Sequence, residues 1–196
     1  MDMALDWLSG CIDPPRTETI GGRIYEMAGA STHHNRICGN ISRIFGNYLV
    51  GKKCEVFQDG EALFLGDNHF YPDVMVVCNP DIIKDDGIYG APDLVAEVLS
   101  PSTANRDKFI KKDLYQQHGV SEYWIVFPEE KAIEVYLLKN GIYVLDNFYS
   151  FVPKWMLRFM NEQRIAEIAH DFKTSLFDDL VINVREVFDK VIKEGE

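Results

Sequence analysis

The sequence of 196 residues predicts a single α/β domain covering residues 1–196, and three observations indicate this class. Short runs rich in β-branched residues, at 71–77 and 92–100, are bounded by Pro, Asn or Gly, which is typical of buried strands. Other apolar residues recur at helical spacing after a capping sequence. The content of 46% hydrophobic and 26% charged residues is ordinary for a globular protein large enough to bury a core.

The first half of the chain is expected to contain one long helix and several strands. Ser31-Thr32 can cap a helix whose apolar residues follow a period of 3.6. The expected elements are a helical lead-in and loop at 1–21, strands at 23–27, 54–57, 61–65 and 71–77, and a helix with the stripe Ile37, Ile41, Ile44, Phe45 and Leu49. Residues 79–92 are polar and are expected to form a surface connection.

The second half is expected to begin with a buried strand at 92–100 and a helix at 103–118. Gly119 suits the left-handed position that ends a helix, and Asn140-Gly141 is a strong hairpin signal. The remaining expected elements are strands at 122–127, 132–138 and 142–147, an amphipathic helical stretch at 154–173, a late strand at 177–182 and a closing helix at 184–194.

Charge and composition exclude some classes of protein. The net charge of −11 and pI near 4.9 argue against general electrostatic binding of nucleic acid, although Arg106, Lys108, Lys111 and Lys112 could line a local basic groove. No apolar run approaches the length of a membrane span, and the first residues are acidic where a signal peptide is basic, so we expect a cytoplasmic protein. The four cysteines, Cys11, Cys38, Cys54 and Cys78, form no Cys-x-x-Cys pair, which favours reduced thiols over a zinc site.

Two acids interrupt apolar strands, and they are the candidate chemical residues. Asp73 follows Pro72, and Glu97 is flanked by three apolar residues before it and two after it. A carboxylate in such a run is costly unless it is paired or binds a cation, so a shared divalent ion is the simplest explanation. Mg²⁺ needs only a few hard oxygen ligands, and it can polarise a phosphodiester and acidify a bound water.

Lys111, on the following helix, is the candidate positive partner. It shares a helix face with Leu114 and Tyr115, whereas Lys112 lies about 100° further around the helix. Each residue also has a structural interpretation: Asp73 as a turn residue, Lys111 as one half of an ordinary Asp107–Lys111 helix pair. His33 and His34, at a helix start, are more often capping or surface residues than ligands, and Asp93 is more often a turn residue. Taken separately, these residues leave the function open.

Taken together, the motifs resemble a known family. The stretch 91–103, the positions Arg106-Asp107, Lys111 and Tyr115, and the stretch 119–126 are similar to the Uma-type family classed with restriction endonucleases, in the PD-(D/E)XK nuclease superfamily. The resemblance covers roughly residues 22–150 and 175–188. It implies a restriction-endonuclease-like α/β fold, with a mixed central β-sheet flanked by helices.

The resemblance also implies roles for individual residues. Asp73 matches the first acid of the superfamily and Glu97 the acid of the (D/E)XK element, but Leu99 stands where the lysine is usual. The matching lysine in the Uma-type family is displaced to the next helix, at Lys111. Asp107 and His34 fall on family-typical positions with supporting roles.

We therefore expect an endonuclease that hydrolyses DNA with Mg²⁺ or Mn²⁺, with Asp73, Glu97 and the Val98 carbonyl as metal ligands and Lys111 assisting the attacking water. The acidic pI favours one alternative, a catalytically weak or inactive nuclease fold that serves as a binding module. A second alternative is hydrolysis of a small phosphoester. A homodimer is expected, because enzymes that cut both strands commonly present two sites and the apolar residues within 155–168 exceed the needs of one core.

Overall fold

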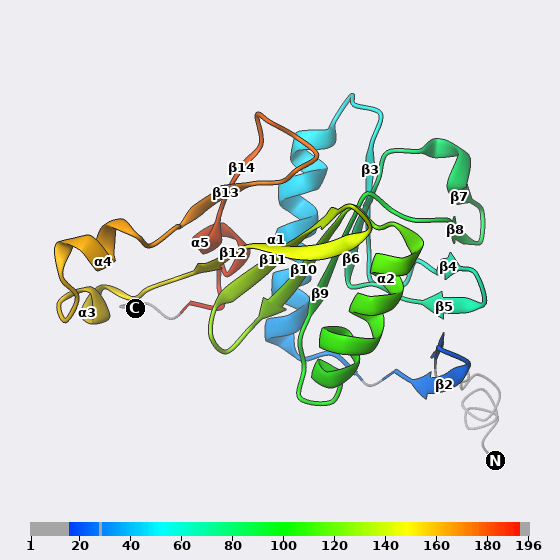
Figure 1. The fold of residues 1–196 in the computed structure, drawn as a ribbon, viewed down its shortest axis with the longest axis horizontal. Coiled ribbons are helices and arrows are strands. Elements are labelled where there is room, and N and C mark those ends of the chain that lie inside the picture. Colours follow the sequence, from blue (N-terminus) through cyan, green and yellow to red (C-terminus); the bar gives the residue numbers. More distant parts are fainter. Residues whose placement is uncertain (1–15, 28, 193–196) are drawn as a thin grey trace, which may run out of the picture.

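A computed structural model describes residues 16–27 and 29–192, and its centre is a mixed β-sheet (Figure 1). Within these ranges the central sheet has the strand order β12-β11-β10-β9-β6-β3. The pair β9–β10 is parallel and the other neighbouring pairs are antiparallel, so the sheet is mixed as expected. Its strands are β3 (Glu55–Gln58), β6 (Val74–Val77), β9 (Leu94–Val98), β10 (Glu122–Phe127), β11 (Ala132–Lys139) and β12 (Ile142–Ser150).

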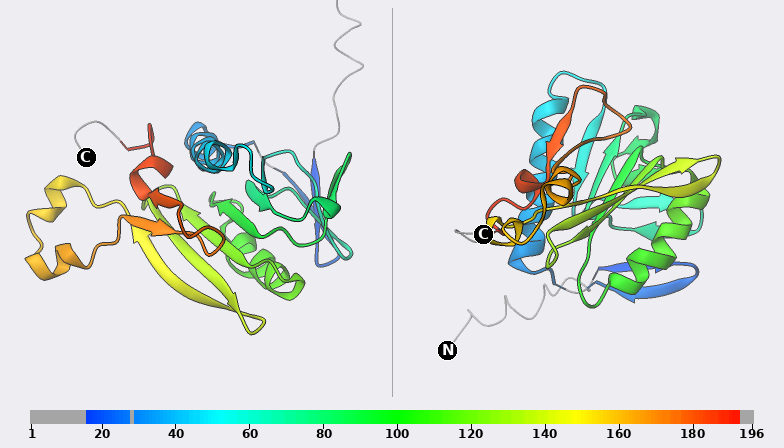
Figure 2. Two further views of the ribbon diagram at one scale, coloured as in Figure 1. Left: turned by 90° about the horizontal axis from the view of Figure 1, so that it is seen from above. Right: turned by 60° about the vertical axis from the view of Figure 1, so that its left-hand side comes forward.

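Helices cover both faces of this sheet (Figure 2). On one face lies α1 (Thr32–Leu49), whose buried residues, including Ile41 and Phe45, pack against Val76 and Trp124. Ser31 caps α1 as expected, because its Oγ accepts a hydrogen bond from the His34 backbone N at 3.1 Å. On the opposite face the helical segment 106–118 packs against the alternate side chains of β6, β9 and β10.

The expected helix at 103–118 has two parts. A π-helical turn, η2 (Arg106–Lys111), runs into α2 (Lys112–His118), and Gly119 ends the helix with φ +87°. The hairpin between β11 and β12 also forms, with Asn140 and Gly141 both at positive φ, as the favoured two-residue turn requires.

A second sheet lies beside the central one and has the order β2-β1-β5-β4-β8-β7 in the described residues. Its strands are β1 (Thr17–Ile20), β2 (Arg23–Glu26), β4 (Leu63–Leu65), β5 (Asn68–Phe70), β7 (Ile83–Lys84) and β8 (Gly87–Tyr89). The surface connection expected at 79–92 is therefore wrong for β7, β8 and the 3₁₀ helix η1 (Pro80–Ile82). Gly87 permits this packing, because a Cβ there would lie 2.7 Å from the Ala62 carbonyl oxygen.

The expected helical lead-in falls mostly on residues 1–15, outside the described residues. Where the chain is described, residues 17–20 form strand β1 instead, pairing antiparallel with β2 and β5. The alternating burial along Thr17–Ile20 explains the strand, because every second side chain faces the interior.

The expected helical stretch at 154–173 is broken. It contains two short helices, α3 (Lys154–Leu157) and α4 (Glu162–Ala166), which project from the sheet at the left of Figure 1, and then strand β13 (Asp171–Lys173). Asn161 is the N-cap of α4, because its side chain accepts a hydrogen bond from the Arg164 backbone N at 2.8 Å.

The late strand and closing helix are both shorter than expected. The strand, β14, spans only Val181–Asn183, since Thr174 Oγ1 holds residues 176 and 177 in a turn. The helix, α5, is the single turn Val184–Val187 in the described part of the chain. Its side chains still contribute to the core beside α1.

A disulfide bond joins Cys54 to Cys78, so the expectation of reduced thiols is wrong for this pair. Strands β3 and β6 pair with Glu55 opposite Val77, and the next positions along each strand, 54 and 78, therefore face each other. Cys38 is a free, buried thiol. None of the helices in the described ranges is long and apolar enough to span a membrane.

Candidate active site

Asp73, Glu97 and Lys111 lie together in one cleft of about 1140 Å³. Strands β6 and β9 are antiparallel with Val74 opposite Ala96, and this register brings Asp73, just before β6, opposite Glu97 in β9. Lys111 enters from η2, on the helical segment that covers this end of the sheet. The structure thus brings together the three residues to which the resemblance gives catalytic roles.

Glu97 is buried and is held by two donors. Lys111 Nζ lies 3.0 Å from Glu97 Oε1, and the Tyr115 hydroxyl donates to the same oxygen at 2.8 Å. Tyr115 comes one turn after Lys111, so one face of the helix supplies both donors. Because both bonds fall on Oε1, the second carboxylate oxygen, Oε2, is not used by them.

Glu18 is a site residue that the sequence reasoning missed. Its side chain is 2% exposed, its Oε1 lies 2.8 Å from Lys111 Nζ, and the same oxygen accepts a hydrogen bond from the Tyr71 backbone N at 3.1 Å. Its Oε2 lies 3.7 Å from Arg106 Nε. The available signal was an acid on the inward side of an alternating strand, which the assignment of residues 1–21 to a lead-in and loop concealed.

Asp107 completes the set of acids around Lys111. Its Oδ1 lies 3.6 Å from Lys111 Nζ, and its backbone carbonyl accepts a hydrogen bond from the Tyr123 hydroxyl at 3.0 Å. The Asp107–Lys111 pair therefore exists, but it is buried and shared with Glu18 and Glu97 rather than being an ordinary exposed helix pair. The π-helical turn holds both residues on the inward face, and such turns are frequent at functional sites.

Burial and charge have opposite effects on the pKa values of these groups. Burial raises the pKa of Glu97 well above its ordinary value, against the effect of Lys111, and neighbouring acids raise it further. Burial alone would lower the pKa of Lys111, but Glu97, Asp107 and Glu18 outweigh it and the pKa is raised. The raised pKa of Lys111 favours its ammonium form, which supplies positive charge to the site.

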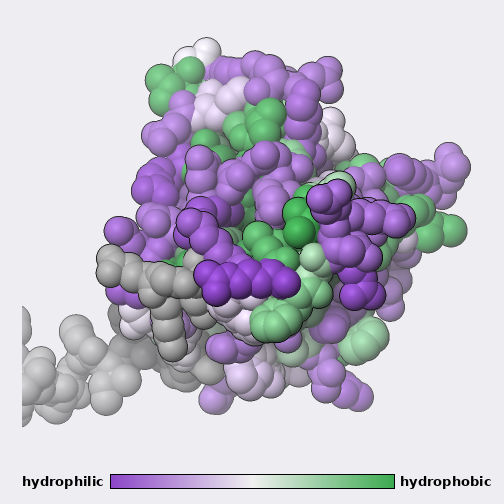
Figure 3. Space-filling view, turned by 90° about the vertical axis from the view of Figure 1, so that its left-hand side faces the viewer, coloured by the Kyte–Doolittle hydropathy of each residue, from purple (hydrophilic) through white to green (hydrophobic). Residues whose placement is uncertain are grey.

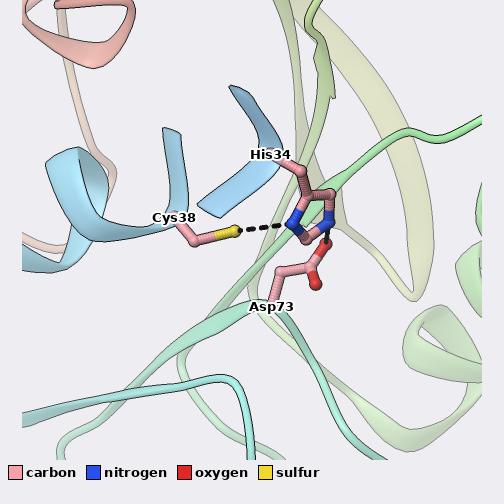
Figure 4. A group of neighbouring side chains, drawn as sticks. All are labelled: His34, Cys38 and Asp73. Atoms are coloured by element: carbon pink, nitrogen blue, oxygen red, sulfur yellow. Dashed lines mark hydrogen bonds and ion pairs between the residues drawn. The ribbon is translucent and has the colours of Figure 1, made fainter. Parts of the chain in front are cut away.

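Asp73 is held by the main chain and by His34. Its Oδ2 accepts a hydrogen bond from the Val98 backbone N at 2.7 Å and lies 3.2 Å from His34 Nε2 (Figure 4). Burial lowers the pKa of His34, but the hydrogen bond to Asp73 and its charge outweigh this, so the pKa is raised. His34, expected only as a supporting residue, is thus a direct partner of Asp73. Asp93 is a structural acid, whose Oδ2 accepts from the Cys78 backbone N at 2.7 Å.

The donor set fits a hard divalent cation. The hydrogen bonds described above use Asp73 Oδ2 and Glu97 Oε1, so they leave Asp73 Oδ1 and Glu97 Oε2 free of these contacts, and both residues line the same cleft. Val98 lies beside them, since its backbone N already contacts Asp73. Two carboxylates and a backbone carbonyl are ligands that Mg²⁺ or Mn²⁺ accepts, with waters completing the shell.

The rim of the cleft carries both signs of charge. Arg16 lies 3.9 Å from Asp59 at the rim. The charged residues lining the cleft outside the central cluster, to which Arg106 belongs through Glu18, are Arg16 and Lys108 on the basic side and Asp59, Glu129 and Glu130 on the acidic side. This mixture provides basic groups for a polyanion without forming a continuous basic surface.

Two curated relatives from Synechocystis sp. are similar to part of this chain. "Uncharacterized protein sll1609" is 36% identical over 105 residues, which is 52% of this chain. "Uncharacterized protein slr1290" is 34% identical over 122 residues, which is 61% of this chain. The matched regions span 59% and 64% of those two proteins, which is less than two thirds of their length.

A solved structure has the same fold. A "putative nuclease belonging to DUF820" from Anabaena variabilis superposes with a TM-score of 0.70 at 18% identity, covering 95% of this chain and 97% of its own. The likeness confirms the expected nuclease-like α/β fold. The model of the Uma2 family, described as "Putative restriction endonuclease", matches residues 8–166, and the chain belongs to this family.

Proposed function

We propose that the protein is an endonuclease that hydrolyses DNA phosphodiester bonds with Mg²⁺ or Mn²⁺. The observation that supports this most is the convergence of Asp73, Glu97 and Lys111 in one cleft, with an unused oxygen on each carboxylate. Membership of the family described as "Putative restriction endonuclease" supports the same reaction class.

Each residue has a distinct role in this proposal. Asp73, Glu97 and the Val98 carbonyl would hold the ion, which supplies Lewis acidity and a bound water of lowered pKa. Lys111 offers a fixed positive charge to the oxygens of a phosphate or to the attacking water. His34 orients Asp73 through its Nε2 contact, while Tyr115 fixes Glu97.

The test replaces a carboxylate by an amide of the same shape, either at the site or at the rim of the cleft. Plasmid and oligonucleotide cleavage would be measured with Mg²⁺, with Mn²⁺ and with a chelator, for the natural sequence, Asp73→Asn, Glu97→Gln and the control Asp59→Asn. We expect metal-dependent cleavage that both site variants lose by on the order of 100-fold or more and that the control retains. Cleavage that survives Glu97→Gln would refute the site, and the absence of cleavage in all proteins would refute the reaction.

A second candidate function is DNA binding without cleavage. The net charge of −11 and the acids Glu129 and Glu130 at the rim favour it, because they weaken the attraction for a long polyanion. A binding titration of duplex DNA over a salt series separates the two functions, since a binding module would retain DNA without producing fragments. A hydrolase of small phosphoesters would instead cleave a nitrophenyl phosphodiester while leaving plasmid DNA intact.

A further inference from the structure

A second potential metal-binding cluster lies beside the proposed magnesium site. His34 and Cys38 are one turn apart on α1, and Cys38 Sγ lies 3.5 Å from His34 Nδ1. On the other side of the ring, His34 Nε2 faces Asp73 Oδ2 at 3.2 Å (Figure 4). One ligand atom from each of the three residues lies within 4.8 Å of the others, and no second group of this kind occurs within 16–27 and 29–192.

We propose that Cys38, His34 and Asp73 form a site that binds a thiophilic divalent cation, Zn²⁺. Zinc binds sulfur at about 2.3 Å and imidazole nitrogen at about 2.0–2.1 Å, so a 3.5 Å separation of Sγ and Nδ1 gives an S–Zn–N angle of about 107°. That angle is close to the tetrahedral value that zinc prefers. Mg²⁺ does not select sulfur, so this site and the all-oxygen site differ in the ion that they favour.

Asp73 would accept a hydrogen bond from the zinc-bound His34, as a carboxylate commonly does from a histidine that binds zinc. With His34 Nε2–H directed at Asp73, the free lone pair is on Nδ1, the nitrogen that faces Cys38. Binding then releases the Cys38 thiol proton to solvent, together with the Nδ1 proton when His34 is protonated, and forms one Zn–S and one Zn–N bond. Water molecules would complete the coordination, while Asp73 holds the His34 ring from its other side.

The surroundings of Cys38 favour binding of a metal ion over a role as a nucleophile. Burial raises the pKa of the Cys38 thiol, and the charges of Asp73, Asp59 and Glu97 raise it further, so a free thiolate is disfavoured. The same carboxylates attract a dication, whose bond to sulfur replaces the proton. A search for Cys-x-x-Cys pairs does not detect this His-x-x-x-Cys spacing, which is why the cysteine pattern alone argued against zinc.

The cluster shares Asp73 with the proposed magnesium site. An ion bound by Cys38 and His34 would fix the His34 ring, whose Nε2 contacts Asp73, and we therefore expect Zn²⁺ to inhibit cleavage that depends on Mg²⁺. This consequence rests on the proposed function, whereas binding of Zn²⁺ does not.

The binding test uses Co²⁺ as a spectroscopic substitute for Zn²⁺. Cys11→Ser would be the background protein, so that Cys38 is the one thiol outside the disulfide. We expect a thiolate-to-Co²⁺ charge-transfer band with intense visible bands of tetrahedral coordination, displaced by Zn²⁺. Cys38→Ser should abolish the charge-transfer band and His34→Ala should weaken binding at least about 10-fold, while His33→Ala, at the neighbouring exposed position, should bind normally. No band in the background protein, or a band that survives Cys38→Ser, would overturn the proposal.

A second measurement avoids dependence on the variants. The ¹¹³Cd NMR shift of the unmutated chain in its oxidised form reports directly whether sulfur is a ligand, and a shift typical of oxygen and nitrogen ligands alone would also reject the site. In the cleavage assay, Zn²⁺ should inhibit the natural sequence and inhibit Cys38→Ser at least about 10-fold less well. If no cleavage exists, the optical and NMR results still decide whether the metal site is present.

Discussion

Replacing Lys111 tests the proposed chemistry and the electrostatics of the site together. Its ammonium lies 2.8 Å from Glu18, 3.0 Å from Glu97 and 3.6 Å from Asp107, and its side chain is 4% exposed. Lys111→Ala therefore removes the one lysine among three buried carboxylates. We expect cleavage to fall by on the order of 100-fold or more, as when one preorganised charge-stabilising group is lost.

The same change should destabilise the fold. Removing one partner of a buried ion pair costs about 3–5 kcal/mol, because the other partner is left buried and uncompensated. Protonation of Glu97 relieves part of this cost at low pH, since its folded pKa is already raised. The loss of unfolding free energy in Lys111→Ala should accordingly be greater at pH 8 than at pH 5, measured by urea denaturation.

The adjacent lysine provides the matched control. Lys112 lies one position further along the helix with its Nζ 3.5 Å from the centre of the Tyr136 ring, away from the carboxylates. Lys112→Ala should retain most of the activity and most of the stability. Lys111→Arg should rescue cleavage poorly, because a wide planar fork does not replace a compact ammonium. Equal losses in the 111 and 112 variants would indicate a general contact with DNA, and full activity in Lys111→Ala would refute the displaced-lysine mechanism.

Four further predictions concern Glu18, Glu97 and assembly. Glu18→Gln should lower cleavage about 10- to 100-fold, because it removes a group that orients Lys111. In a Lys111→Ala background the same change should cause no further loss of cleavage. Additive losses in the double variant would mean that Glu18 has a purely structural role. Glu97→Ala should abolish Mg²⁺ binding in calorimetry, whereas equal heats from both proteins would contradict the assignment. Because the folded pKa of Glu97 is raised, its ionisation costs stability as pH rises above the ordinary glutamate value, and Glu97→Gln should remove that part of the pH dependence. We also propose a homodimer, which Phe159→Ser should weaken in light scattering, and a monomer at micromolar concentration would reject it.

The dimer prediction depends on apolar side chains that the fold leaves uncovered. Trp155 is 53% and Phe159 82% exposed, on the segment of α3 and α4 that projects from the sheet. Figure 3 faces this end of the molecule and shows hydrophobic areas lying among mostly hydrophilic residues. Exposed apolar groups of this kind, rimmed by polar ones, are typical of interaction surfaces.

The sequence could predict those parts of the fold whose signals are local. Strand β9 is an apolar run interrupted at Glu97, the cap at Ser31 precedes a regular stripe, and Asn140-Gly141 encodes its own turn. Glu97 is recognisable because an acid stands alone among apolar neighbours. In each case the information lies within one continuous segment of the sequence.

The features that were missed depend on tertiary pairing. Cys54 and Cys78 are joined only because β3 and β6 pair in one register across 24 residues of sequence. Glu18 comes from a short strand of the second sheet, and nothing within Thr17–Ile20 indicates that it meets Lys111 more than 90 residues later. The partnership of His34 with Cys38 is a local helix contact, but its relation to Asp73 again requires the fold.

The charges of the assembled site give a physical reason to expect a divalent cation. Glu18, Asp73, Glu97 and Asp107 are four carboxylates, and Lys111 with Arg106 supplies two positive charges, so with these groups ionised and His34 neutral the cluster has a formal charge of −2. Burying this excess negative charge is unfavourable, and the raised pKa of Glu97 reflects that cost. One dication would balance the charge and would allow Glu97 to ionise at lower pH. Mg²⁺ binding should consequently release protons below neutral pH, and calorimetry in buffers of different ionisation enthalpy can count them; binding without proton release in the acidic range would contradict this explanation.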